Sequence, residues 1–129
     1  MSLLESDLQR AFITWCGTLV HKIPELEWVW HCPNGGKRNA FEAQNLKSQG
    51  VKAGIVDLHL DVARGGYHGW KCELKKPGGN CAMPSEEQIK YLAFVDEQGY
   101  CTLVSNDFDQ VKEHLLRYIG GGLIREENV

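Results

Sequence analysis

The sequence lacks long apolar runs, internal repeats and low-complexity tracts. No stretch approaches the roughly 20 consecutive apolar residues that a membrane-spanning helix needs, so we expect no membrane partner. The first residues include acids and no basic segment before an apolar one, so we expect no secretory signal. Hydrophobic residues at 43% and charged residues at 24% are typical of a globular chain. Together these features predict a soluble, single-domain protein of the cytoplasm.

Paired cysteines are missing as well. The five cysteines are scattered and form no Cys-x-x-Cys motif, which disfavours a disulfide framework and fits a reducing compartment. His31 and Cys32 are the only adjacent histidine and cysteine. A structural zinc site would need two more ligands nearby. A non-nuclease metalloprotein that uses this pair stays open as an alternative, and it predicts tightly held zinc and indifference to magnesium.

The charge is unevenly distributed along the chain. The formal net charge is −3, yet residues 31–90 carry nine basic and six acidic residues. A local basic surface is what contacts with nucleic-acid phosphates require. Taken alone, however, the asymmetry is explained by default as an ordinary solvated surface.

Apolar periodicity and turn residues predict eight elements in the order α-β-α-β-β-α-β-α. The expected ranges are 3–21, 26–31, 39–49, 55–62, 67–75, 85–98, 100–104 and 107–119. Residues 64–66 (Arg-Gly-Gly) separate two strand-like runs and indicate a hairpin. The order implies an α/β domain, residues 1–119, with a mixed central β-sheet flanked by helices. Residues 120–129 are expected to form a flexible tail.

Asp57, Glu73 and Lys75 are the candidate catalytic residues. Side chains alternate along a strand, so Glu73 and Lys75 project to one face. If residues 55–62 pair with residues 67–75, Asp57 lies beside Glu73 on that face. Two adjacent carboxylates repel one another unless a cation neutralises them, and oxygen ligands suit Mg²⁺ or Mn²⁺. Such a site with a lysine nearby has the groups needed for phosphodiester hydrolysis. A Glu-x-Lys strand taken alone is usually only a surface ion pair.

These residues resemble a known family. Gly-x-x-Asp-Leu, Glu-Leu-Lys-Lys-Pro-Gly-Gly and Pro-Ser-x-x-Gln, followed by the Gly99-Tyr100 strand, resemble the virus-type replication-repair nuclease domain (VRR-NUC). That domain belongs to the PD-(D/E)xK superfamily, whose members share a restriction-endonuclease-like α/β core. The likeness runs from about residue 5 to residue 119. One departure is Val56, where the family commonly has proline before the aspartate.

The resemblance implies roles for further residues. Asp57, Glu73 and the Leu74 carbonyl would bind the metal with help from Glu5, and Lys75 would be the catalytic lysine. Gln88 would support Lys75 or a substrate phosphate. The DNA backbone would be contacted by Asn34, Lys37, Arg38 and Lys76.

The resemblance implies a stand-alone, phage-type nuclease that acts on DNA in a bacterial host cell, with a role in repair. It implies cleavage of branched DNA, as by a Holliday-junction resolvase, and a homodimer. No small-molecule cofactor is expected. The alternative is a catalytically weak nucleic-acid-binding or assembly module of phage replication and repair.

Several of these residues have purely structural explanations. Ser85 with Gln88, and Ser2 with Glu5, have the spacing of a helix capping box. We expect His59 and Asp61 to point outward from a half-exposed strand and His31 to be a packing residue. The tryptophans Trp28, Trp30 and Trp70 could stack on bases, but core or interface positions are the more frequent finding.

Overall fold

Four strands form one mixed sheet in the part of the chain that the computed structural model describes, residues 4–33 and 39–126. The strands are β1 (Trp30–His31), β2 (Leu58–Leu60), β3 (Trp70–Leu74) and β4 (Cys101–Ser105), and they lie in that order across the sheet. The pairs β1–β2 and β2–β3 are antiparallel, whereas β3 and β4 are parallel. The predicted mixed sheet and the predicted order of elements are therefore confirmed.

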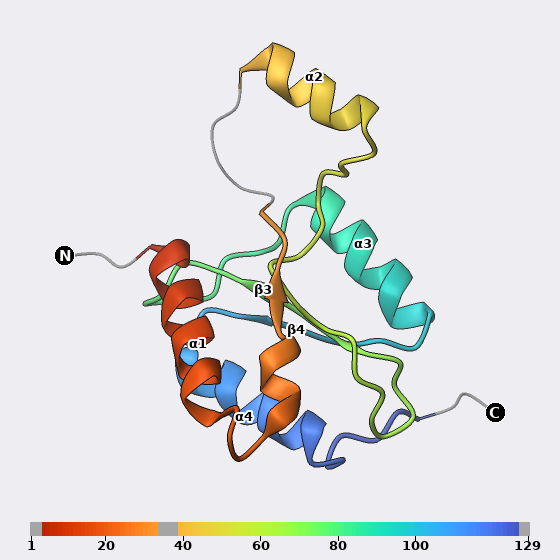
Figure 1. Ribbon diagram of the computed structural model, residues 1–129. Helices are drawn as coiled ribbons and strands as arrows, with labels where there is room; N and C mark the ends of the chain where they lie inside the picture. Colours follow the sequence, from red (N-terminus) through yellow and green to blue (C-terminus); the bar gives the residue numbers. More distant parts are fainter. Residues whose placement is uncertain (1–3, 34–38, 127–129) are drawn as a thin grey trace.

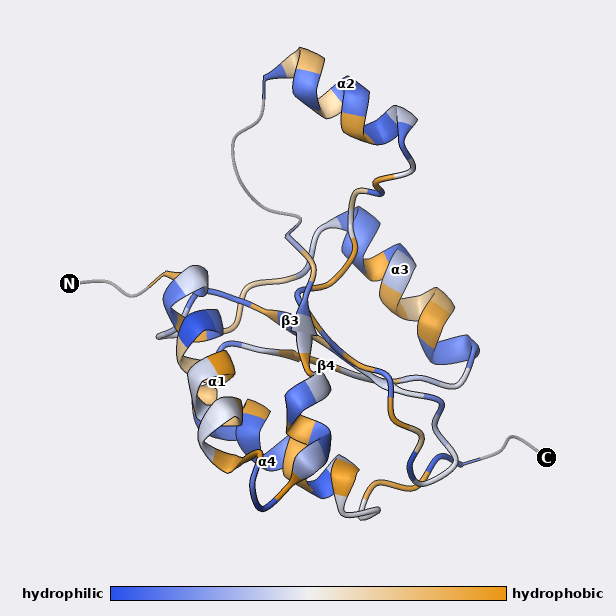
Figure 2. Ribbon diagram, viewed as in Figure 1, coloured by the Kyte–Doolittle hydropathy of each residue, from blue (hydrophilic) through white to orange (hydrophobic). Residues whose placement is uncertain are grey.

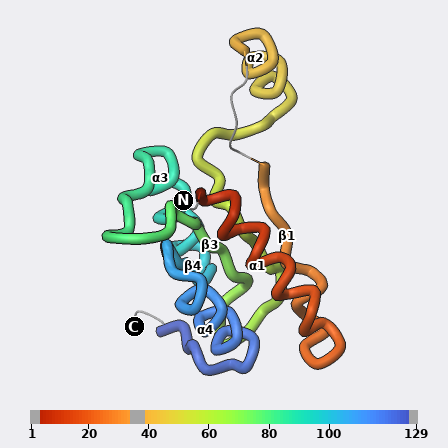
Figure 3. The backbone as a smooth tube through the Cα atoms, turned by 90° about the vertical axis from the view of Figure 1, so that its left-hand side faces the viewer, coloured from red at the N-terminus to blue at the C-terminus, as the bar shows by residue number. Residues whose placement is uncertain are grey.

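Helices cover both faces of the sheet (Figure 1). Helices α1 (Glu5–Leu19) and α4 (Phe108–Ile119) pack on one face, and α3 (Glu86–Glu97) lies on the opposite side. Helix α2 (Ala40–Ser48) stands apart from the sheet and contains no buried residue (Figures 1 and 3). Among the described residues, no helix combines the length and the apolar character needed to cross a membrane.

The main core lies between the sheet and the α1–α4 pair. Apolar residues recur at helical intervals in both helices, so each helix has an apolar side toward the core and a more polar side toward solvent (Figure 2). Trp70 at the centre is fully buried and stacks on Phe12, with ring centroids 6.4 Å apart. Its Nε1 donates to Nδ1 of His114 at 3.0 Å, which satisfies the one polar atom that Trp70 takes into the core. The expected core position of Trp70 is confirmed.

A tight turn joins the two central strands, as the Arg-Gly-Gly sequence predicts. Arg64 and Tyr67 exchange backbone hydrogen bonds, and Gly65 and Gly66 between them have φ values of 58° and 87°. Positive φ at both central residues is the requirement of a type I′ hairpin turn. The amide of Arg125 donates to the carbonyl of Gly65 at 2.8 Å, so part of the segment after α4 is tied to this turn.

Two local predictions are wrong at the N-terminal end. Helix α1 begins at Glu5 with Leu4 as its N-cap, and the Leu4 amide donates to Asp7 Oδ2 at 2.9 Å. Asp7, rather than Glu5, is thus the residue that caps the helix start. The strand expected over 26–31 is reduced to Trp30–His31, because Pro24–Trp28 form a 3₁₀ helix, η1. Proline suits the first turn of a helix, where its missing amide costs no hydrogen bond.

Candidate active site

The hairpin register brings Asp57 and Glu73 together. Leu58 pairs with Cys72 in the β2–β3 ladder, so the next position along each chain places Asp57 opposite Glu73. Beyond the last ladder pair, Oδ2 of Asp57 accepts a hydrogen bond from the Leu74 amide at 2.9 Å. The Asp57 side chain therefore takes over the role of a backbone acceptor and is fixed against β3.

The segment before Asp57 passes very close to α3. Gly54 has a φ of 83°, and a Cβ atom there would lie 2.6 Å from the backbone carbon of Glu87. Only glycine combines this left-handed conformation with so close an approach. Gly54 thus lets the segment that leads into β2 lie against the first turn of α3, which also carries Gln88.

The Glu73 carboxyl group is buried without full hydrogen bonding. Its residue is only 3% exposed, and Oε2 has no hydrogen-bond partner among the described residues. Burial above all, with a hydrogen bond to Asp57 and the charge of Asp57, raises the pKa of Glu73 to about 9. Lys75 opposes the shift, and Glu5 adds to it. Without a cation, the Asp57–Glu73 pair therefore shares a proton at neutral pH.

This pair fits a divalent cation. A buried carboxyl oxygen without a partner, next to a second carboxylate, is stabilised when a hard cation replaces the shared proton. Among the described residues, no group of three or more histidine, cysteine, aspartate or glutamate side chains could hold a metal ion. A cation here would therefore depend on Asp57 and Glu73, with its remaining ligands from backbone oxygen such as the Leu74 carbonyl and from water. Glu5, exposed at the first position of α1, acts on Glu73 through its charge.

Lys75 lies immediately after β3 and is held by Gln88. Its Nζ donates to Oε1 of Gln88 at 2.9 Å, and its backbone amide donates to the Ser105 carbonyl at 2.9 Å. The same Oε1 atom accepts from the Ser85 amide at 2.9 Å, while the Gln88 amide donates to Ser85 Oγ at 3.1 Å. The predicted capping box is confirmed, and one glutamine both caps α3 and orients the lysine.

The predicted DNA contacts are only partly within the described chain. Lys76 is exposed and directly follows Lys75 in the chain. Asn34, Lys37 and Arg38 lie outside the described residues.

His31 and Cys32 both bind the backbone of Asp57. The Cys32 amide donates to the Asp57 carbonyl at 2.9 Å, and His31 Nδ1 lies 3.0 Å from the same oxygen and donates to it. With no group of three such ligands in the part of the chain that is described, the structure gives no support to a zinc site at this pair. The pair instead fixes the backbone of Asp57, the residue directly before β2.

His59 is the residue that sequence reasoning placed wrongly. It was expected to point outward, but it is only 1% exposed and lies beneath the indole of Trp30, with ring centroids 4.2 Å apart. Its Nε2 donates to the Val56 carbonyl at 2.8 Å, and its Nδ1 accepts from Lys71 Nζ at 3.1 Å. Burial, with the charge of Lys71, lowers the pKa of His59 to about 4, so the ring is neutral. Asp61 is exposed, as expected.

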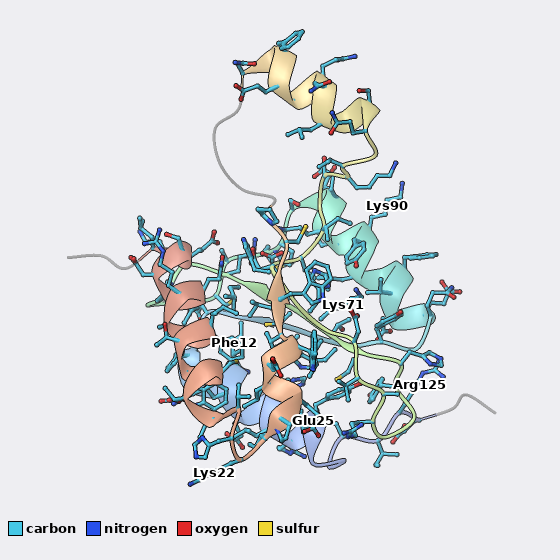
Figure 4. The ribbon with its side chains drawn as sticks, in the orientation of Figure 1. Phe12, Lys22, Glu25, Lys71, Lys90 and Arg125 are labelled. Carbon is cyan, nitrogen blue, oxygen red and sulfur yellow. The ribbon has the colours of Figure 1, made fainter. Side chains whose placement is uncertain are left out.

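Lys71 belongs to a second layer of side chains on the carboxylate face of the sheet, in which only His59 is fully buried. Its Nζ lies 5.5 Å from the ring centroid of Tyr91 on α3 and 4.9 Å from that of Tyr100, between the sheet and α3 (Figure 4). Cations in such positions are attracted to the faces of aromatic rings. Trp30, His59 and Lys71 occupy neighbouring cross-strand positions. Once the strand register is known, these positions predict that the three side chains lie side by side on one face of the sheet.

The chain is similar to a solved structure described as "VRR_NUC domain protein". The two are 30% identical in sequence and superpose with a TM-score of 0.78, over 97% of this chain and 95% of the other. A scan of protein-family models and a search of curated proteins give no match. The near-complete overlap confirms the restriction-endonuclease-like fold that the sequence predicts.

Proposed function

Because the chain belongs to the VRR-NUC nuclease domain family, we propose that it is a metal-dependent nuclease that hydrolyses phosphodiester bonds in DNA. The observation that carries the proposal is the buried Glu73 carboxyl, which lies beside Asp57 and has an oxygen without a partner. Burial of such a carboxyl pair destabilises the fold, and destabilising groups of this kind are found mainly at functional sites.

Asp57 and Glu73 would hold Mg²⁺ or Mn²⁺, with the Leu74 carbonyl as a further ligand and Glu5 contributing through a bridging water and its charge. A cation bound there polarises a phosphate and lowers the pKa of a water molecule. Because Glu73 would have to be deprotonated to hold the cation, affinity for the cation should rise with pH.

Lys75 supplies positive charge next to the carboxylates. Its ammonium stabilises the negative charge that develops on the phosphate in the transition state, or orients the attacking water. Gln88 restricts the ammonium to one position through the 2.9 Å hydrogen bond. Such pre-organisation should raise the cleavage rate more than the affinity for DNA, because the ammonium acts on the negative charge that develops only in the transition state.

The substrate is proposed to be branched or otherwise structured DNA. Lys76, together with Asn34, Lys37 and Arg38, would contact phosphates, and phosphate contacts carry no sequence information. Selection by DNA shape therefore fits this set of residues better than selection by sequence. A homodimer, which would place two sites on a junction, is proposed from the family resemblance alone.

The test is cleavage of branched, flapped and linear DNA in Mg²⁺, Mn²⁺ or EDTA, with DNA binding measured in parallel. Asp57→Asn and Lys75→Met should each lower the cleavage rate by about 100-fold or more and leave folding intact. Lys22→Met is the matched control, because Lys22 is exposed (Figure 4) and follows the C-terminal end of α1, whereas Glu5 is at the N-terminal end of that helix.

Cleavage by both variants at the wild-type rate would refute the assignment. If wild type and variants bind DNA but none cuts in any metal, the chain is the alternative, a nucleic-acid-binding module that does not turn over.

A further inference from the structure

Trp30 is exposed and yet rigidly held. The residue is 45% exposed, although tryptophan is a residue that proteins usually bury. One face of its indole stacks on His59 at a centroid distance of 4.2 Å and an interplanar angle of 19°. Its Nε1 donates to Asp61 Oδ2 at 3.2 Å, and its backbone belongs to β1. The ring is thus fixed in position and orientation.

The support beneath Trp30 is itself immobile. His59 is buried and has both ring nitrogens in hydrogen bonds, one to the Val56 carbonyl and one to Lys71. A buried histidine with two such partners has one allowed orientation. The indole therefore rests on a rigid base, and its other side forms part of the molecular surface.

The indole lies on the same face of the sheet as the proposed catalytic carboxylates. Trp30 pairs with His59, which is two residues from Asp57 and projects to the same side of β2. Two residues of a strand span about 7 Å, which is about two base steps of DNA at about 3.4 Å each. A base on the indole would then belong to a nucleotide about two steps from a phosphate at Asp57 and Glu73.

We propose that Trp30 is a stacking site for an unpaired nucleobase of the DNA substrate, close to the phosphate that is cut. The inference rests on the proposed function and specifies its substrate class. An aromatic face binds any base, because every base has a π-face, and it gives no sequence preference. A base inside a duplex is already stacked on both sides, and taking it out costs a few kcal/mol. Trp30 thereby selects flaps, gaps and branch points, where the base is already unstacked.

The first experiment measures DNA binding in EDTA by fluorescence anisotropy, so that cleavage does not interfere. The probes are a flap with an unpaired strand and a plain duplex of equal length. Trp30→Leu should weaken flap binding by about 5- to 100-fold and leave duplex binding within twofold. Trp30→Phe keeps an aromatic face and should retain most of the flap affinity.

Trp28→Leu is the matched control. Trp28 is also an exposed tryptophan, 67% exposed, two residues earlier in the chain, but it lies in η1 and takes part in no ring stacking within the described chain. It should leave binding of both probes unchanged. Thermal unfolding of each variant checks that the fold is intact.

The second experiment moves an abasic nucleotide along the unpaired strand. With wild type, one or two adjacent abasic positions should weaken binding, and at those positions Trp30→Leu should cause no further loss. The scan on wild type alone tests the inference even if substitution of Trp30 disturbs folding.

Equal weakening of flap and duplex binding by Trp30→Leu, or an abasic scan without any sensitive position, would overturn the inference. If wild type cuts DNA in Mg²⁺ but Trp30→Leu binds normally, only the stacking site is wrong. If wild type shows the abasic-sensitive position but cuts nothing in any metal, the stacking site stands and the proposed nuclease activity fails.

Discussion

The substitution Glu73→Gln should make the metal-free chain more stable at neutral pH. Burial and the neighbouring Asp57 raise the pKa of Glu73 from 4.5 to about 9. In the folded chain the carboxyl therefore holds a proton that the unfolded chain releases above pH 4.5. The folded state binds more protons than the unfolded state in this window, so the contribution of Glu73 to stability is greatest below pH 4.5 and falls as pH rises toward 9.

The size of the effect follows from the same two values. Each pH unit in the window costs about 1.4 kcal/mol, so the loss accumulated between pH 4.5 and pH 7 is about 3 kcal/mol. Glutamine has the shape of the protonated glutamate, and its amide can donate to Asp57 as the carboxyl does. The variant should match wild type near pH 4.5 and exceed it by up to about 3 kcal/mol at pH 7.

The assay is urea unfolding of both proteins in EDTA from pH 5 to pH 8.5. The difference between their free energies of unfolding isolates the contribution of residue 73 from all other titrating groups. Glu97→Gln, an exposed position at the end of α3, is the control and should show the wild-type slope. Parallel pH profiles for wild type and Glu73→Gln would refute the account of a buried, protonated carboxyl.

The same pair of proteins tests cation binding. Mg²⁺ should raise the unfolding temperature of wild type, because the cation replaces the shared proton and binds only the folded chain. It should have much less effect on Glu73→Gln, which lacks one of the two charges. An equal rise in both proteins would place the cation elsewhere.

Two further predictions concern the contacts that position the site. Ser85→Ala and Gln88→Ala should each lower the free energy of unfolding by about 1 kcal/mol, because each removes part of the α3 cap. Only Gln88→Ala should also slow DNA cleavage, by about 10- to 100-fold, because it removes the hydrogen bond that holds Lys75. Equal cleavage rates for the two variants would contradict this. In urea unfolding, Gly54→Ala should lower the free energy of unfolding by at least about 2 kcal/mol more than Gly50→Ala. Both glycines have positive φ, but only a Cβ at position 54 meets the α3 backbone. Equal losses would show that the chain relieves this close approach without strain.

Local sequence signals were sufficient to predict most of the fold. The Gly65–Gly66 turn predicted the β2–β3 hairpin but not its register. The turn pairs Arg64 with Tyr67, whereas the ladder pairs Leu58 with Cys72, so the pairing shifts by one residue between them. The helix starts at Asn39, Ser85 and Asp107 could also be predicted, because each of these side chains caps its helix. The first strand was overestimated because its aromatic residues have strand propensity, while Pro24 favours a helical turn.

The candidate site could be predicted in position but not in environment. Alternation along two paired strands places Asp57 and Glu73 on one face. It does not show what covers that face, and so it could not predict that Glu73 is 3% exposed and protonated. That burial depends on how the strands and helices around Glu73 pack. These elements are far apart in the sequence, so their packing leaves no local sequence pattern.

The misplacement of His59 has the same physical origin and shows how the site is kept rigid. Alternation assigns His59 and Lys71 to a polar face, and polar faces of small sheets are usually solvated. Here the indole of Trp30 covers one of them, and two tyrosine rings surround the ammonium of the other. Each buried polar atom then needs a partner, and the hydrogen bond from His59 to the Val56 carbonyl provides one. Because Val56 directly precedes Asp57, the requirement to satisfy a buried histidine also fixes the backbone that presents the proposed metal ligand.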